Sequence, residues 1–452
     1  VISDDLLDEV TALVEWPVAL TGTFEERFLQ VPAEALVSSM KEHQKYFHLV
    51  DDSGALQPFF ITVSNIESKD ATQIIDGNER VIRPRLSDAD FFFSSDKKTT
   101  LASRVERLKS IVFQQKLGTL FDKTSRLIQL SGELAAGTGA DKDQAQRAAE
   151  LSKTDLITLM VGEFADMQGI AGRYYALNDG EAEAVADALQ QQYWPRFAGD
   201  VLPNNPIATT LALADRLDTI VGIFGIGQPP SGSRDPFALR RASLGVLRVL
   251  VEGQLDLDLR EALELTAAQY PADILLEDTV EQVMAYMVER FRAWYEDESI
   301  ATEVFNAVAA KALTVPLDIH HRVHAVHAFS QLPQAAALAA ANKRVSNILS
   351  KQELILGEPG VSKDLLTDAA EKTLADQVAA KTDLTAGLLA QGQYEQILSS
   401  LADLQDPVDA FFDQVMVMAD DPALQNNRLN LLRQLRDLFL QVADISQLVV
   451  SR

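Results

Sequence analysis

Three histidines in the second half of the chain have a spacing that could bind a metal ion. His320, His324 and His327 lie four and then three residues apart, so on a helix they would share one face. Zinc binds imidazole nitrogens presented in this way. No carboxylate at matching spacing completes the set, and a helical face of partly buried or solvated histidines is the more common arrangement. The chain has no cysteine, which excludes thiolate metal sites and disulfides. The sequence therefore predicts no metal site.

A second set of residues raises the question of metal-dependent phosphohydrolase chemistry. Asp215 and Asp218 lie in a helical stretch, and an aspartate on such a helix is a usual last ligand in the HD phosphohydrolase fold. That chemistry needs His and Asp side chains around a divalent metal that activates water. None of the six histidines lies between residues 49 and 319, and Glu163–Phe164 stands where a His-Asp pair would be expected. We therefore expect an HD-like helical scaffold without a working metal site.

The loop from Gly225 to Arg234 suggests phosphate binding. Gly225-Ile-Gly227 resembles a phosphate-cradling glycine loop, but it lacks a Gly-Lys-Ser/Thr continuation and follows no convincing strand. A connection between two helices is therefore expected. Arginines bind phosphate through paired hydrogen bonds, and three lie at the end of this loop or soon after it: Arg234, Arg240 and Arg241. The alternative is ion pairing with nearby aspartates: Asp215, Asp218 or Asp235.

Three more arginines occur within six positions, at Arg80, Arg83 and Arg85. If the segment is extended, Arg83 and Arg85 point to the same side. The triplet Phe91–Phe93 follows soon after. Two interpretations are open: a charged loop closed on an aromatic core, or a contact with RNA or with a partner subunit.

The last quarter of the chain carries further candidates for RNA contact. On a helix, Lys343 and Asn347 are four residues apart and share a face with a mixture of donors suited to base edges and phosphate. Asn342 and Arg344 belong to the same run. Asp420-Asp421-Pro422 is a helix-capping pattern, and the helix that it begins carries three arginines, each of which could equally be structural: Arg428, Arg433 and Arg436.

The elements that must position these residues change in character along the chain. Residues 1–100 read as an α+β module, in which two β-rich runs flank the turn-like segment 51–54 and form a hairpin. Helical periodicity begins near residue 101, where Val105, Leu108, Ile111 and Val112 recur, and it continues to the end. The polar segment 353–390 reads as a linker-like helix or a long loop.

Composition limits the kinds of partner that the chain can bind. The chain has 452 residues, 47% of them hydrophobic, which is enough for several folded domains. Its net charge of −26 repels phosphate overall, so any nucleic-acid site must be a local basic patch. Residues 80–126 hold 11 Lys/Arg against 5 Asp/Glu, whereas residues 252–303 hold 3 against 14. No apolar run is long enough to span a membrane and no signal peptide is apparent.

Five long runs, in order and over nearly the whole chain, resemble the β subunit of bacterial heterotetrameric glycyl-tRNA synthetase. They are MKEHQKYF, GNERVIRPRLSDADFFF, GIGQPPSGSRDPFALRRA, AAANKRVSNIL and FFDQVMVMADD with NNRLNLLRQL. The last two also resemble the DALR-type anticodon-binding domain of arginyl-tRNA synthetase. One departure is Gln425, where a basic residue would be expected. Since the chain begins at Val1, we expect a large C-terminal piece of such a subunit.

The resemblance implies a mostly α, multidomain fold. We expect an N-terminal α+β module (1–100), an HD-like helical domain without metal ligands (101–255), an acidic helical linker region (256–330) and a DALR-type anticodon-binding domain (331–452). The implied function is recognition of glycine tRNA in an α₂β₂ ligase of the cytoplasm. The α subunit would hold ATP and magnesium and activate glycine, whereas this chain would be non-catalytic and bind no cofactor. The alternatives are an HD-type phosphohydrolase and a helical scaffold that binds only protein.

Overall fold

The computed structural model describes residues 3–351 and 360–448. The chain divides into two compact units, here called unit 1 (residues 1–228 and 265–276) and unit 2 (229–264 and 277–452). The predicted fold class, mostly helical with a small sheet near the start, is confirmed. The boundaries predicted at residues 100, 255 and 330 divide the chain differently and stay predictions.

Unit 1 begins with a three-stranded antiparallel sheet. The strands β1 (Val18–Thr23), β2 (Phe47–Val50) and β3 (Leu56–Ser64) lie in the order β1-β3-β2. The predicted hairpin is β2–β3, and its turn is held by the Asp51 carboxylate, which accepts the backbone N–H groups of Ser53 and Ala55 at 2.9 and 3.0 Å. Helix α1 (Asp4–Leu13) contributes Leu6 and Val10 to a small core with Phe47 of the sheet.

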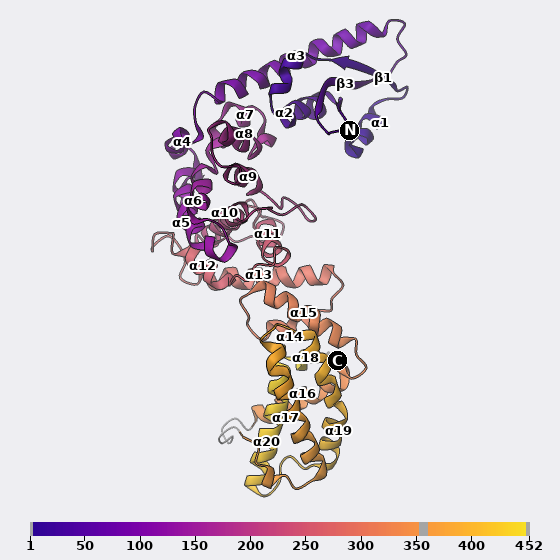
Figure 1. Cartoon of the computed structure of the whole chain (residues 1–452), viewed down its shortest axis with the longest axis vertical. Helices are drawn as coiled ribbons and strands as arrows, with labels where there is room; N and C mark the ends of the chain where they lie inside the picture. Colours follow the sequence, from indigo (N-terminus) through magenta and orange to yellow (C-terminus); the bar gives the residue numbers. More distant parts are fainter. Residues whose placement is uncertain (1–2, 352–359, 449–452) are drawn as a thin grey trace. The chain divides into compact units, whose positions relative to one another are not determined.

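The charged loop predicted around Arg80 is wrong, and the segment is not extended, because these residues lie inside a long helix. Helix α3 (Ala71–Asp96) runs through both Gly77 and Pro84 and leads from the sheet to the helices of the same unit (Figure 1). Its buried stripe has helical spacing, with Ile82, Leu86, Ala89 and Phe93 on one side. Burial of these four side chains outweighs the local helix-breaking tendency of a glycine and a proline.

The remaining secondary structure of unit 1 is helical except for a small β4–β5 hairpin. The predicted helical run Val105–Val112 is only partly correct: η3 (Val105–Ser110) is a 3-10 helix, and Val112 opens a strand. After α4 (Leu101–Arg104) and η3 the elements are β4 (Val112–Gln114), β5 (Gly118–Thr119), α5 (Leu120–Thr138), α6 (Lys142–Leu151), α7 (Leu159–Glu163), α8 (Ile170–Asn178), α9 (Glu183–Gln191) and α10 (Pro206–Gly225). The short elements are α2 (Ala33–Ser38), the π-helix η2 (Ser39–His43) and the 3-10 helices η1 (Glu26–Gln30), η4 (Thr154–Ile157) and η5 (Ala165–Met167).

Helix α10 ends where the glycine loop was predicted to begin. A Cβ on Gly225 would lie 2.2 Å from the Leu275 side chain, and Gly227 has a left-handed φ of +74°. Close packing at Gly225 and left-handed backbone at Gly227 thus explain these two glycines. The next long helix is α11 (Leu239–Glu252) in unit 2, so the predicted connection between two helices is confirmed.

The elements of unit 2 over its described residues are helices, apart from one isolated β-bridge between Ser231 and Arg234. The first elements are α11, α13 (Thr279–Asp297), α14 (Thr302–Ala309) and α15 (Pro316–Ser330), and α12 (Leu259–Ala267) crosses the division between the units. There follow α16 (Ala335–Ser350), η6 (Lys363–Leu365), α17 (Ala369–Leu389), α18 (Tyr394–Leu401), η7 (Ala402–Leu404), α19 (Gln405–Gln414), α20 (Pro422–Leu440) and η8 (Ile445–Leu448). Helix α16 packs against α19 and α20, and α17 packs against the same two helices (Figure 1).

The helical part of the predicted segment 353–390 is α17, and residues 352–359 lie outside the described part of the chain. Across residues 3–351 and 360–448, no helix is both long enough and apolar enough to cross a membrane.

Candidate RNA-binding surface

Helix α16 presents most of the C-terminal candidates on its outer side. Val345 and Leu349 are fully buried, whereas Lys343 is half-buried and Arg344 and Asn347 are exposed. Asn342 faces inward: it is buried, and its amide donates to the Leu338 carbonyl at 3.0 Å. The prediction that Asn342 faces RNA does not fit this burial. The reason is geometric, since residues 342, 345 and 349 share the helix face that packs on the core.

Arg344 stacks on an aromatic ring and forms no ion pair with a carboxylate in the described part of the chain. Its guanidinium lies 4.2 Å from the centroid of Phe412 in α19, which is half-buried. Stacking of this kind fixes the plane of a guanidinium and leaves its N–H groups available. Lys343, Arg344 and Asn347 therefore form one outward-facing group of donors, here called the α16 surface.

Arg428 lies inside the protein and ties three segments together. It is buried, its Nε donates to the Glu371 carboxylate, and a terminal nitrogen lies 2.9 Å from Asp368. Its other terminal nitrogen donates to the Met416 carbonyl at 2.8 Å. Burial alone would raise the pKa of Glu371, but the hydrogen bond from Arg428 holds that pKa below its usual range. The predicted RNA contact of Arg428 does not fit this internal role.

The next arginine of the same helix has the opposite environment. Arg433 is half-exposed, and within the described residues no carboxylate lies within ion-pair distance of it. Arg436 is half-buried, 3.6 Å from the Asp437 carboxylate next to it. Of the predicted cations on α20, Arg433 is the one whose environment suits a phosphate contact.

The arginines after the glycine loop are not used in ion pairs among the described residues. Arg234 and Arg241 are exposed, and a guanidinium nitrogen of Arg240 donates to the Gly232 carbonyl. Asp235, one expected partner, instead accepts the backbone N–H groups of Leu239 and Arg240 at 2.8 and 2.9 Å and so caps α11. The predicted ion pairing of these arginines is wrong, and the predicted phosphate contact stays a prediction.

Two of the three arginines on α3 are already paired. Arg83 lies 2.8 Å from Glu25, and Arg85 lies 3.9 Å from Glu163. Arg80 is exposed, with no such carboxylate among the described residues. Their RNA contact stays a prediction, and only Arg80 offers a charge that is not already neutralised.

The excess of positive charge in residues 80–126 is partly internal. Arg104, Lys123 and Arg126 are buried in unit 1, and Lys109 is paired with Glu106 on the surface. The local balance counted along the sequence therefore overstates the positive charge that an approaching phosphate would meet.

The aspartates that could have served as metal ligands are neutralised by buried cations. The Lys123 ammonium lies 3.1 Å from Asp215 and 2.9 Å from Asp218, and Lys153 lies 3.0 Å from Asp215. Arg126 donates to Asp218 at 2.6 Å. Burial alone would raise the pKa of Asp215, but the two ammonium groups hold it well below its usual range. Both carboxylates are thus committed to cations of the protein itself.

The three spaced histidines of α15 do not assemble a metal site. The rings of His320 and His324 meet edge to face with centroids 4.3 Å apart, and His320 shares a hydrogen bond of 3.0 Å with the Tyr295 hydroxyl. Burial and the two neighbouring histidines lower the pKa of His320 to about 4. No group of three or more His, Asp or Glu side chains among the described residues could hold a metal ion.

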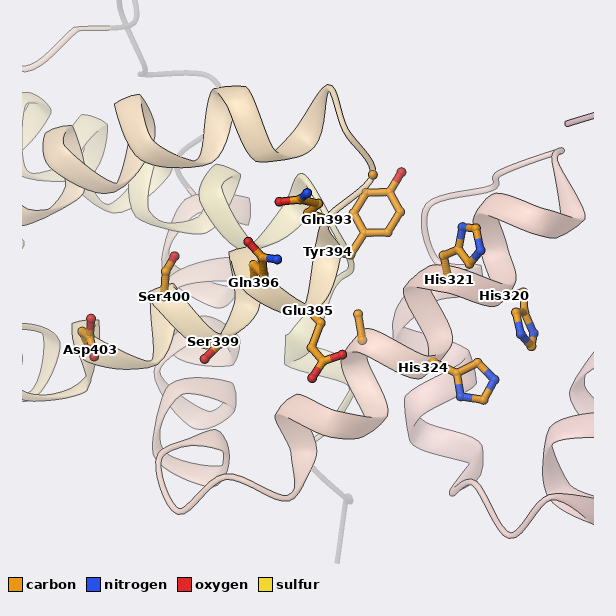
Figure 2. Close-up of a pocket in the computed structure, with 12 residues that line it drawn as sticks. His320, His321, His324, Gln393, Tyr394, Glu395, Gln396, Ser399, Ser400 and Asp403 are labelled. Atoms are coloured by element: carbon orange, nitrogen blue, oxygen red, sulfur yellow. The ribbon is translucent and has the colours of Figure 1, made fainter. Parts of the chain in front are cut away.

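His320 and His324, together with His321, line an open cavity of about 950 Å³ between α15 and α18. Figure 2 shows His320, His321 and His324 on one side and the residues from Gln393 to Asp403 on the other. Tyr394 is engaged by Asp318 and Arg322, and Asp403 is paired with Lys381 at 2.7 Å. Glu395 brings negative charge, so the cavity is unsuited to phosphate.

Comparison with known proteins places these sites in a family. The family model described as glycyl-tRNA synthetase beta subunit matches residues 1–310. This chain belongs to that family. A second model, the DALR anticodon binding domain, matches residues 338–445, which include the α16 surface and Arg433. The resemblance predicted from the sequence runs is thereby confirmed.

Members of the glycyl-tRNA synthetase beta subunit family align with the chain almost from end to end. A glycine–tRNA ligase beta subunit of Chromohalobacter salexigens is 59% identical over 99% of this chain and 65% of its own length. The relative of the same name from Marinobacter nauticus is 59% identical over 99% of the chain and 64% of its length. That from Pectobacterium carotovorum is 56% identical. The chain thus spans somewhat less than two thirds of the length of these relatives.

Two features of these sites leave no direct signal in the sequence. The pairing of Lys123 and Lys153 with Asp215 joins positions far apart in the chain. The stacking of Arg344 on Phe412 also depends on tertiary contact. The one local hint is a lysine in an otherwise apolar helical stripe, as Lys123 is between Leu120 and Leu127.

Proposed function

We propose that this chain is the tRNA-binding part of the beta subunit of a glycine–tRNA ligase and that it recognises glycine tRNA without catalysing the reaction. Membership of the family and the match to an anticodon-binding domain support this proposal. An alpha subunit, in an α₂β₂ assembly, would hold ATP and magnesium and activate glycine. This chain would bind no cofactor of its own.

The observation that carries the proposal is the α16 surface. Lys343 and Asn347 lie on the outer side of one rigid helix inside the segment that matches the anticodon-binding domain, and Arg344 is stacked beside them. An anticodon is single-stranded, and its bases can be read by side-chain donors and acceptors. In this arrangement Lys343 contacts phosphate and Asn347 contacts a base edge.

The test is tRNA binding over a series of salt concentrations, with glycine tRNA and a version in which the anticodon is exchanged. The logarithm of the binding constant falls linearly with the logarithm of the salt concentration, and the steepness of that fall is here called the salt slope. Lys343→Ala should weaken binding of both RNAs and lower the salt slope by roughly one unit. Asn347→Ala should weaken binding of glycine tRNA by about 1–3 kcal/mol and reduce the preference between the two RNAs, with the slope unchanged.

Lys311→Ala is the matched control, because it removes the same charge outside the segment that matches the anticodon-binding domain. It should bind like the wild type. If Lys343→Ala and Asn347→Ala both fold normally and bind both RNAs like the wild type at every salt concentration, the α16 surface is not the anticodon site. ATP–pyrophosphate exchange by the purified chain alone would contradict the non-catalytic role.

A further inference from the structure

The methionines of this chain are divided sharply between core and surface. The sequence has seven. Five are buried, with exposed fractions of 7% or less: Met40, Met160, Met167, Met284 and Met287. The other two are exposed by 74% (Met416) and 44% (Met418). They lie two residues apart between α19 and α20, so the exposed thioethers are concentrated in one place.

The alternation of burial shows that both methionines are displayed on the surface, whereas the valines beside them are not. Val415 and Val417 are buried, at 6% and 8% exposure, whereas Met416 and Met418 are exposed. Val415 has extended backbone angles (φ −110°, ψ 124°). Extended backbone at Val415 turns the side chains of Val415 and Met416 to opposite sides, and Val417 and Met418 lie in a bend that follows. The valines therefore anchor the segment, and the methionines face away from the core.

The segment is fixed in this conformation by the buried side of α20. Arg428 donates to the Met416 carbonyl at 2.8 Å, and Arg428 is itself held by Glu371 and Asp368. The Gln425 amide lies 3.5 Å from the Met418 sulfur. Internal contacts thus fix the chain at Met416 while its side chain is left uncovered. The two exposed thioethers thus form a small apolar patch on a segment whose backbone is held in place.

The surroundings favour unpaired nucleic-acid bases as the occupant. Phe412, four residues before Met416, carries the stacked guanidinium of Arg344 from α16. Thioethers are polarizable and make favourable contacts with aromatic rings, and every base has a flat π-face. Asp413 and Asp420 flank the segment and repel phosphate, whereas the α16 surface supplies positive charge. A nucleotide would therefore lie with its base on the methionines and its phosphate toward α16.

We propose that Met416 and Met418 form an apolar platform on which unpaired bases of the bound tRNA stack. This inference rests on the proposed function and adds to it a contact that does not depend on charge. The platform would accept any base, whereas Asn347 would discriminate between bases. Gln425 supports the platform through Met418, which gives a structural use to a position where the family resemblance led us to expect a basic residue.

The distribution of methionines permits a direct test by oxidation footprinting. Mild peroxide treatment converts exposed methionine to its sulfoxide, so Met416 and Met418 should react well before the five buried methionines. We expect saturating glycine tRNA to slow sulfoxide formation at both sites at least fivefold, as measured by peptide mass spectrometry. The α subunit, added without RNA, should leave both rates unchanged. Protection by that protein and not by tRNA would overturn the proposal in favour of a protein interface.

Substitution gives the second readout. Replacing both methionines by glutamine keeps their length but removes the apolar thioether, and should weaken tRNA binding on the order of tenfold with the salt slope unchanged. The double leucine variant is the matched control and should bind within about twofold of the wild type. Suppose that tRNA binding depends on Lys343 as expected, but that tRNA does not protect the methionines and binds the double glutamine variant as tightly as the wild type. The platform is then wrong, and the proposed function stands. If the chain binds no tRNA at all, both fail.

Discussion

Replacement of Arg428 by methionine tests whether this arginine stabilises the fold from inside or contacts RNA. Glu371 has no exposed area, so removal of the guanidinium leaves a buried carboxylate without its main partner. Breaking a buried ion pair from one side typically costs about 3–5 kcal/mol. Glu371 keeps the backbone N–H groups of Thr367 and Asp368, at 2.8 and 3.0 Å, which favours the lower end of that range. The lost hydrogen bond to the Met416 carbonyl adds to the cost.

The assay must resolve one unit of a two-unit chain, because a single unfolding free energy is not defined for such a protein. Urea titration followed by hydrogen-exchange mass spectrometry reports separately on the peptides of α17 and α20. We expect both peptides to lose protection together in Arg428→Met, at a lower urea concentration than in the wild type. Below that concentration, where the variant is still folded, the salt slope of tRNA binding should match that of the wild type.

Arg433→Met is the matched control on the same helix. Arg433 is half-exposed and unpaired among the described residues, so its removal should change stability by less than about 0.5 kcal/mol. If it contacts phosphate, the salt slope falls by about 0.7–0.9. An Arg428→Met variant as stable as the wild type but with a reduced salt slope would refute the internal role assigned to Arg428.

Three further predictions concern unit 1, each measured by urea unfolding of its peptides in the same way. Lys123→Met removes a cation shared by the buried Asp218 and the half-buried Asp215 and should destabilise the unit by about 3–5 kcal/mol; an unchanged transition would contradict this pairing. Burial raises the pKa of Asp155 to about 6. The folded state therefore keeps the Asp155 proton to a higher pH than the unfolded state, and wild-type stability relative to Asp155→Asn should fall by about 2 kcal/mol as pH rises from 4 to 6; a constant difference would be the contrary result. Gly225→Ala places a methyl group against Leu275 and should destabilise by about 1–3 kcal/mol, whereas Gly77→Ala in open helix should stabilise by about 0.5–1 kcal/mol; equal effects would show that packing at Gly225 is not decisive.

Most elements could be predicted from local pattern because local pattern determines them. The β2–β3 hairpin has its turn residues in sequence, and the Asp421 carboxylate caps α20 at 2.8 Å from the Ala423 N–H, as the Asp-Pro pattern predicts. Helix α3 could not be predicted in this way, since Gly77 and Pro84 weaken it locally and its stability comes from the face buried against other elements. The HD-like topology of residues 101–255 stays a prediction.

The candidate site was harder to predict because burial is a tertiary property. Arg428 and Arg433 are both arginines on one helix, five residues apart, yet one is buried on carboxylates and the other is half-exposed. The same holds for Asn342 and Asn347, which differ only in the face of α16 that they occupy. Sequence spacing placed all four on the right helices and could not show which side of each helix meets the core.

The distribution of charge in unit 2 suggests how an acidic protein can bind RNA. The whole chain has a net charge of −26, and its long-range electrostatic field therefore repels phosphate. On and near the α16 surface, the cations without a carboxylate partner among the described residues are few: Lys343, Arg344 and Arg433. Each phosphate neutralised contributes about 0.7–0.9 to the salt slope, so three such contacts give a slope near 2 to 3, well below that of strongly basic nucleic-acid binders. Binding energy must then come largely from contacts that do not depend on charge. The stacking proposed for Met416 and Met418 and the hydrogen bonds proposed for Asn347 are of that kind. Both act on contact, whereas salt screens the repulsion from the distant charges of the chain.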